Sequence, residues 1–163
     1  PEAVLNLYGR DWKFPDGSSY MKMLQETEFP KIKPFDKDIQ FHGAIPYTEI
    51  PNMYTKATIC VFPSHMETLG LVAPEAMAMG KIVVFTNLGP GKEIIDDKVD
   101  GLLIDPYQPE SIADALLWAF NHHNEAHQLA VNASKSALAK FDSTRITLQN
   151  MEWYIKIITN ACD

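Results

Sequence analysis

The chain has 163 residues, of which 46% are hydrophobic and 21% charged, and its formal net charge is -7. This length predicts a single domain over residues 1–163, and the acidic balance argues against a nucleic-acid partner or a general affinity for anionic membranes. The longest apolar runs are far shorter than the ~20 residues that cross a bilayer. The two cysteines, Cys60 and Cys162, lack spacing partners, which predicts a reducing, cytoplasmic compartment with no disulfide and no zinc site.

Short β-branched runs alternate with helical stretches along the chain, which is typical of an α/β fold with a mostly parallel sheet and helices on both faces. The segment 29–37, with its prolines and lysines, is predicted to be a loop. Two helices are predicted at the end of the chain with no strand between them, at 124–140 and 143–160. Before them, strands are predicted at 4–8, 39–42, 58–62, 82–86 and 101–104, and helices at 19–27, 48–56, 71–79 and 109–121.

Four of the predicted strands end at a turn residue or a small polar residue, at Gly9, Gly43, Ser64 and Asn87. In open parallel sheets, ligands bind beyond the carboxyl ends of the strands. We therefore expect the functional site to lie in the loops that follow these four strands.

The segment 63–80 carries the pattern that points to chemistry. A strand ends at Phe62, a loop carries Glu67, and Gly70 opens a helix. Glycine permits the close backbone approach of a ligand, and the first amides of a helix lack internal acceptors and attract anions. Glu67 and Glu75 flank this helix start and can face the same cleft. Carboxylates so close to an anion site are expected to contact hydroxyl groups.

Glu67 and Glu75 stand in the order Pro-Ser-x-x-Glu-x-x-Gly-Leu-x-x-x-Glu-Ala-Met-Ala-x-Gly, which resembles the E-x7-E signature of retaining glycosyltransferases of family 4. The strand end at Gly43, the glycine-rich loop 89–93 and the last strand are similar to that family as well. The resemblance implies a GT-B fold, in which two Rossmann-like domains face each other. It identifies this chain with the C-terminal, donor-binding domain, lacking that domain's first strand and helix.

The resemblance also implies a role for each matching residue. Glu67 is the expected catalytic residue, which contacts the transferred sugar or stabilises positive charge at its anomeric carbon, and Glu75 is expected to bind the ribose. For His65, a loop histidine without a ligand is an equally good interpretation. The expected donor-binding residues, besides Glu75, hold the diphosphate or flank the nucleotide sugar: Leu69, Gly70, Leu71, Gly9, Gly43, Ile45 and His65.

The implied reaction transfers a hexose from a nucleoside diphosphate sugar to an acceptor hydroxyl with retention of configuration, as in polysaccharide biosynthesis. It needs no metal and no cofactor, because preorganised hydrogen-bond donors stabilise the leaving diphosphate. The implied protein partner is the N-terminal acceptor domain of the same enzyme, without which the chain is expected to be inactive. A peripheral association of the full enzyme with the inner membrane face stays open.

Two other functions stay open on the sequence alone: a sugar-nucleotide epimerase of the same fold, and a non-catalytic nucleotide-sugar-binding module. His123 and His127 have the i, i+4 spacing of metal ligands, but no third ligand is near them in the sequence, so no metal site is predicted.

The strands at 4–8 and 58–62 are expected to pair directly, because the strand that the resemblance places between them is missing. The apolar residues of 143–160 are too many for one helix stripe, which predicts an exposed apolar surface.

Overall fold

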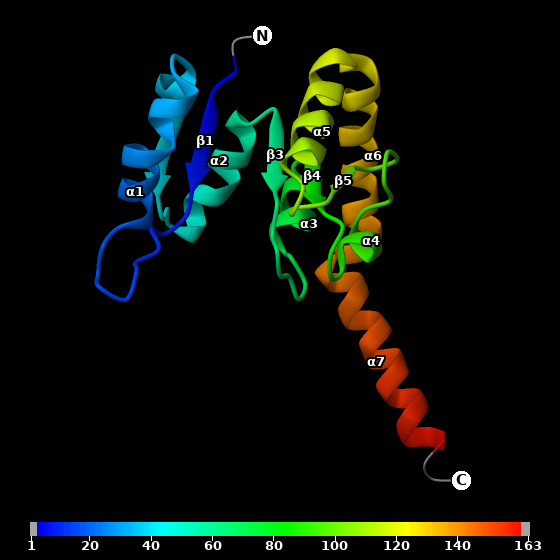
Figure 1. The fold of residues 1–163 in the computed structure, drawn as a ribbon. Coiled ribbons are helices and arrows are strands. Elements are labelled where there is room, and N and C mark those ends of the chain that lie inside the picture. Colours follow the sequence, from blue (N-terminus) through cyan, green and yellow to red (C-terminus); the bar gives the residue numbers. More distant parts are fainter. Residues whose placement is uncertain (1–2, 161–163) are drawn as a thin grey trace. The chain divides into compact units, whose positions relative to one another are not determined.

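Residues 3–160 are described by the structure, a computed structural model. The chain folds into two compact units, the N-terminal unit (residues 1–51) and the C-terminal unit (residues 52–163), coloured from blue to red along the chain in Figure 1. The fold is α/β, with parallel sheets and helices on both sides. The predicted fold class is confirmed.

In the N-terminal unit, β1 (Leu5–Tyr8) pairs in parallel with β2 (Ile39–Gly43). Parallel neighbours need a long crossover connection. Here it contains α1 (Tyr20–Thr27) and two short 3-10 helices, η1 (Phe29–Ile32) and η2 (Phe35–Asp38). The two 3-10 helices occupy most of the segment that was predicted to be a loop.

The N-terminal unit is stabilised by local contacts, since none of its described residues is buried. Ser19 caps α1 by accepting a hydrogen bond from the Lys22 amide, as short polar side chains do at helix starts. The rings of Trp12 and Phe14 meet edge to face with their centroids 4.9 Å apart. The β1–β2 ladder and such contacts therefore hold this unit, rather than an apolar core.

The C-terminal unit contains a sheet in the order β3-β4-β5, with both strand pairs parallel. Apart from α4, which was not predicted, its elements begin and end within two residues of the predicted positions. The elements from residue 47 onward are η3 (Tyr47–Glu49), α2 (Ile50–Lys56), β3 (Ile59–Phe62), α3 (Val72–Ala78), β4 (Ile82–Thr86), α4 (Gly91–Ile94), β5 (Leu102–Ile104), α5 (Pro109–Asn121), α6 (His123–Phe141) and α7 (Ser143–Asn160).

The core of the C-terminal unit is built around β4, the central strand of its sheet. Val83, Val84, Phe85 and Thr86 are fully buried, and α3, α5 and α6 all contact this strand. A parallel strand with helices on its faces is apolar along its whole length, without the alternation of a half-exposed strand. The residues of β4 follow this rule. Because the strand is buried in the core, the start of the loop that follows it is held at a fixed position.

Helix α6 packs closely on α3 because small side chains line its inner face. Ala126, Ala130, Ala133 and Ala137 are buried and recur at intervals of three and four residues, which places them on one side of a helix. Ala76 of α3 is buried as well. Small residues on both helices let the two backbones approach each other and hold α3 against the sheet.

The direct pairing expected between the strands at 4–8 and 58–62 stays a prediction, because the two strands belong to different units. β1 pairs with β2, and β3 pairs with β4, in two separate sheets. In each pair, the partner is the next strand along the chain, reached through a crossover that contains a helix. Sequential strands joined in this way are usually neighbours, so each strand finds its partner locally.

Helix α7 confirms the predicted exposed apolar surface. None of its residues is buried, and Trp153, Tyr154 and Ile155 are all about 60% exposed. The helix also carries charged residues, Arg145, Glu152 and Lys156. Within residues 3–160, no helix combines the length and the hydropathy that crossing a membrane requires.

Cys60 lies in β3, and its thiol is expected to resist modification in the folded chain. The side chain is 7% exposed, and burial raises the pKa of the thiol from 9.0 to about 11, although the nearby Lys81 lowers it slightly. At pH 8 this shift reduces the reactive thiolate about a hundredfold. In a Cys162→Ser variant, a chromogenic disulfide reagent should label Cys60 in urea but not in buffer. Rapid labelling of the native chain would contradict the burial of this thiol.

Candidate functional site

The loop between β3 and α3 carries most of the predicted site residues, and Gly70 fixes its shape. Gly70 is buried and has a φ of +67°, in the left-handed region that favours glycine. A Cβ atom at this position would lie 2.6 Å from the Phe85 ring and 3.0 Å from Cγ of Glu67. The Glu67 side chain thus packs directly against the Gly70 backbone, with the buried Phe85 beneath it.

The loop after β4 also contacts Glu67, through Gly89. Gly89 has a φ of +56°, and a Cβ atom there would lie 2.6 Å from the backbone oxygen of Glu67. The loops after β3 and β4 therefore meet at Glu67. This contact places the predicted glycine-rich loop beside the predicted catalytic residue.

Glu67 itself is half-buried, and its carboxylate is held close to its own backbone. One carboxylate oxygen accepts a hydrogen bond of 3.0 Å from the Thr68 amide. Among the ion pairs of the described residues, none includes Glu67. The carboxylate is therefore fixed in direction and is not neutralised by a lysine or arginine of this part of the chain.

Glu75 lies one turn into α3, and its carboxylate is contacted by the hydroxyl of Tyr54 in α2. Tyr54 is only 2% exposed, and its hydroxyl lies 3.4 Å from Oε2 of Glu75 and 3.2 Å from the backbone oxygen of Val72. Sequence reasoning missed this tyrosine, because nothing in its spacing indicates that its hydroxyl reaches the second glutamate. Tyr54 is thus a further residue of the candidate site.

The backbone amides between the two glutamates fall into a paired set and an unpaired set. The amides of Ala73 and Glu75 donate to the oxygens of Gly70 and Leu71, at 3.0 Å each. No backbone acceptor among the described residues is recorded for the amides of Leu69, Gly70 and Leu71. Grouped N–H donors without acceptors are suited to phosphate oxygens.

His65, in the same loop, contacts the segment that follows β5. Its ring stacks on Tyr107 with the centroids 4.6 Å apart and an angle of 30°. Its Nε2 lies 3.2 Å from the backbone oxygen of Pro106. A carbonyl oxygen only accepts, so Nε2 carries the proton of this hydrogen bond. Tyr107 was not predicted as a site residue, because no motif indicates its contact with His65.

The other predicted donor-binding residues lie together in the N-terminal unit. The Gly9 amide donates a hydrogen bond of 2.9 Å to the Gly43 oxygen, because Gly9 follows β1, Gly43 ends β2, and the two strands pair side by side. The rings of Tyr8 and His42, next to these glycines, stack with centroids 4.5 Å apart. Ile45 follows two residues after Gly43 and is half-buried. The structure thus brings the predicted residues into two groups, one in each unit.

Within residues 3–160, no group of three or more His, Cys, Asp or Glu residues has the arrangement of a metal site. His123 and His127 at the start of α6 thus have no third partner in the described part of the chain. The expectation of a reaction without metal stays a prediction.

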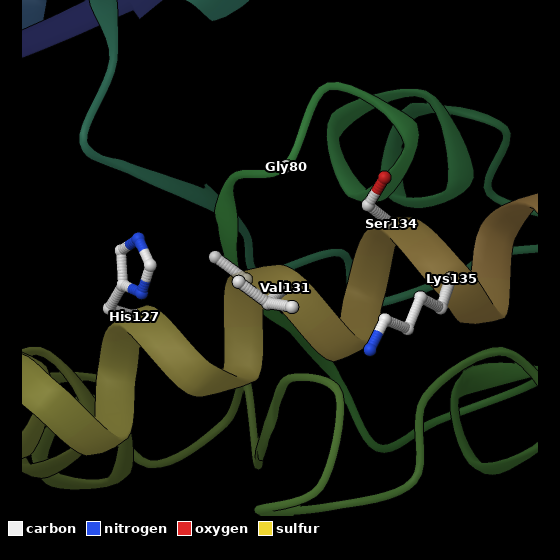
Figure 2. A pocket seen from close by; sticks show the side chains of 6 residues that line it. Gly80, His127, Val131, Ser134 and Lys135 are labelled. Atoms are coloured by element: carbon white, nitrogen blue, oxygen red, sulfur yellow. The ribbon is translucent and has the colours of Figure 1, made fainter.

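The C-terminal unit also has an open pocket of about 330 Å³, where Gly80 faces His127, Val131, Ser134 and Lys135 of α6 (Figure 2). A second pocket of about 450 Å³ shares Gly80 and His127 with it. Gly80 precedes β4, so both pockets lie towards the amino ends of the strands, and no predicted site residue lines either. Ligands of open parallel sheets bind at the other end, which leaves the candidate site at the loops around Glu67.

Comparison with known proteins supplies an independent observation. The profile of the family described as Glycosyl transferases group 1 matches residues 31–136, more than half of the chain. The match includes both glutamates, Gly43, Gly70 and Gly89.

Among individual proteins, YtcC of Bacillus subtilis (strain 168) is 32% identical over 162 residues, which cover 98% of this chain and 39% of YtcC. The chain thus spans less than half the length of this relative.

Two solved structures are similar over most of the chain. HepE of Anabaena, in complex with UDP, has a TM-score of 0.84 at 25% identity, and the match covers 96% of this chain and 42% of HepE. The C-terminal domain of LpcC, a glycosyl transferase group 1 family protein from Francisella tularensis, has a TM-score of 0.70 at 33% identity. That match covers 80% of this chain and 66% of the LpcC domain.

Proposed function

Because the chain belongs to the family of glycosyl transferases group 1, we propose that it binds a nucleoside diphosphate sugar as the donor domain of a retaining, metal-independent glycosyltransferase. One observation carries the proposal. Glu67 packs against Gly70 and Gly89, and the Tyr54 hydroxyl contacts Glu75. Between the two glutamates lie the amides of Leu69, Gly70 and Leu71, which have no backbone acceptor among the described residues. This arrangement offers carboxylates for hydroxyl groups and N–H donors for a diphosphate.

In this proposal the two carboxylates act on different parts of the donor. Glu75 accepts hydrogen bonds from the ribose hydroxyls, and Glu67 from hydroxyls of the transferred sugar. As the bond between the anomeric carbon and the diphosphate breaks, positive charge develops at that carbon, and the Glu67 carboxylate stabilises it. Charge-assisted hydrogen bonds of this kind are about twice as strong as neutral ones.

The leaving diphosphate gains negative charge in the same step. The amides of Leu69, Gly70 and Leu71 are fixed before the reaction, so they stabilise this charge without reorganising. Donors of this kind make a divalent cation unnecessary for the leaving group. The acceptor hydroxyl then bonds to the anomeric carbon on the face that the diphosphate has left, and its proton passes to the departing phosphate.

Acceptor binding is assigned to a second, N-terminal domain, because a relative such as YtcC is more than twice as long as the matched segment. The complexes of HepE with UDP, and with UDP and glucose, support a uridine nucleotide as the first donor to test. The buried, unpaired Cys60 supports a reducing, cytoplasmic location.

Calorimetric titration tests the proposed function. The chain is titrated with three pairs of ligands: UDP and UDP-glucose, GDP and GDP-mannose, and ADP and ADP-glucose. One pair is expected to bind with a Kd of about 0.1–1 mM, or about -4 to -5.5 kcal/mol. Binding should be unchanged by EDTA, because the amides rather than a cation hold the diphosphate. Absence of binding by every pair would refute the proposal, and binding that needs magnesium would refute its metal-independent form.

A further inference from the structure

The contact between His65 and Tyr107 has no role in the proposed chemistry, yet it forms a fixed, exposed aromatic surface. The two rings are stacked at 4.6 Å, and His65 is anchored by its hydrogen bond to the Pro106 oxygen. Tyr107 is nevertheless 66% exposed. A large aromatic ring that is held in place and still open to solvent is suited to contact a ligand.

The segment that carries Tyr107 is held by Asp105, the residue that follows β5. One carboxylate oxygen of Asp105 accepts a hydrogen bond of 3.0 Å from the Tyr107 amide, and the other accepts one of 2.8 Å from the Gln108 side chain. The Asp105 amide in turn donates to Oγ of Ser111, in the first turn of α5. The Tyr107 amide is thus tied to Asp105, and Asp105 is tied in turn to Gln108 and Ser111, which lowers the entropy lost when a ligand binds to the Tyr107 ring.

The aromatic pair lies at the same edge of the sheet as the candidate site. His65 precedes Glu67 by two residues in the loop after β3, and Tyr107 follows β5. The loop after β4, between them in the sheet, touches the Glu67 backbone through Gly89. All three loops therefore meet at the carboxyl ends of adjacent strands, where the sugar end of the donor is proposed to bind.

We propose that Tyr107, backed by His65, forms a platform for one face of the sugar ring of the nucleotide sugar; this inference rests on the proposed function. A pyranose directs its hydroxyls outward and presents C–H groups on its faces. Those C–H groups carry slight positive charge, and the face of an aromatic ring is negative. Glu67 would then bind hydroxyls at the edge of the sugar, while Tyr107 contacts its face.

The platform acts on the sugar and not on the nucleotide, which gives a specific test. The pair of ligands that binds best in the titrations above, with UDP and UDP-glucose first, is titrated into three variants. Tyr107→Ala is expected to weaken the nucleotide sugar about three- to tenfold and to change the affinity of the free nucleotide less than about twofold. Tyr107→Phe keeps the ring and should bind both ligands like the unchanged chain.

Tyr154→Ala is the matched control, because Tyr154 is also a tyrosine and is 60% exposed, but lies on α7. It should leave both affinities unchanged. Equal losses for nucleotide and nucleotide sugar in Tyr107→Ala, or no loss for either, would overturn the platform while leaving the proposed function intact. If no nucleotide or nucleotide sugar binds the unchanged chain, the proposed function fails and the platform with it.

Discussion

Replacing Gly70 by alanine is expected to lower the free energy of unfolding by about 2–5 kcal/mol, the sum of a backbone term and a packing term. The backbone term arises because Gly70 has a φ of +67°, which an alanine adopts only at a cost. The packing term arises because the added methyl group would lie 2.6 Å from the Phe85 ring. Phe85 is fully buried on the central strand and cannot move without disturbing the core.

Gly80 provides a control that separates the two terms. Its φ is +64°, close to that of Gly70, but a Cβ atom there meets nothing within 4 Å. Gly80→Ala should therefore lose only the backbone term, about 1–2 kcal/mol. Urea unfolding of both variants measures the difference. Equal losses for the two variants would show that the contact with Phe85 does not constrain the loop.

The second large effect is expected from the two glutamates, measured by steady-state kinetics in a full-length enzyme that contains this domain. Glu75→Gln keeps the size of the side chain but removes a charge-assisted hydrogen bond to the ribose. The free energy of donor binding should then become less favourable by about 1.5–3 kcal/mol, which raises KM. Glu67→Gln should instead lower kcat more than donor affinity, because its charge acts mostly in the transition state.

Glu125→Gln serves as the control for these variants, because Glu125 is an exposed residue of α6 outside the candidate site. Its kinetic constants should match those of the unchanged enzyme. If Glu67→Gln and Glu75→Gln both raise KM to the same extent and leave kcat unchanged, the proposed division of roles is wrong.

Most of the fold could be predicted from the sequence, because the apolar runs are short, continuous and separated by turn residues. The run at β4 is a clear example, since a strand with helices on its faces is apolar at every position. The helix α4 was missed because Gly89, Pro90 and Gly91 precede or begin it, and these residues indicate a turn rather than a helix.

The candidate site could be predicted only where a motif marks it. The spacing of Glu67, Gly70 and Glu75 along one loop and one helix indicates their proximity, since the three positions are close in sequence. Tyr54 and Tyr107 come from other elements and contact those residues only after the chain has folded. Neither the contact of the Tyr54 hydroxyl with Glu75 nor the stacking of Tyr107 on His65 produces a pattern in the sequence. Only the structure identifies these two residues.

The absence of buried residues in the described part of the N-terminal unit has a consequence for how the native chain opens. Segments with little buried apolar surface open at low free energy, well below that of global unfolding. Amide protons in β1 and β2 should therefore exchange with deuterium long before those of β4, which lies in the buried core. In limited proteolysis, the first cuts should likewise fall within the N-terminal unit, and the C-terminal unit should remain as the longest-lived fragment.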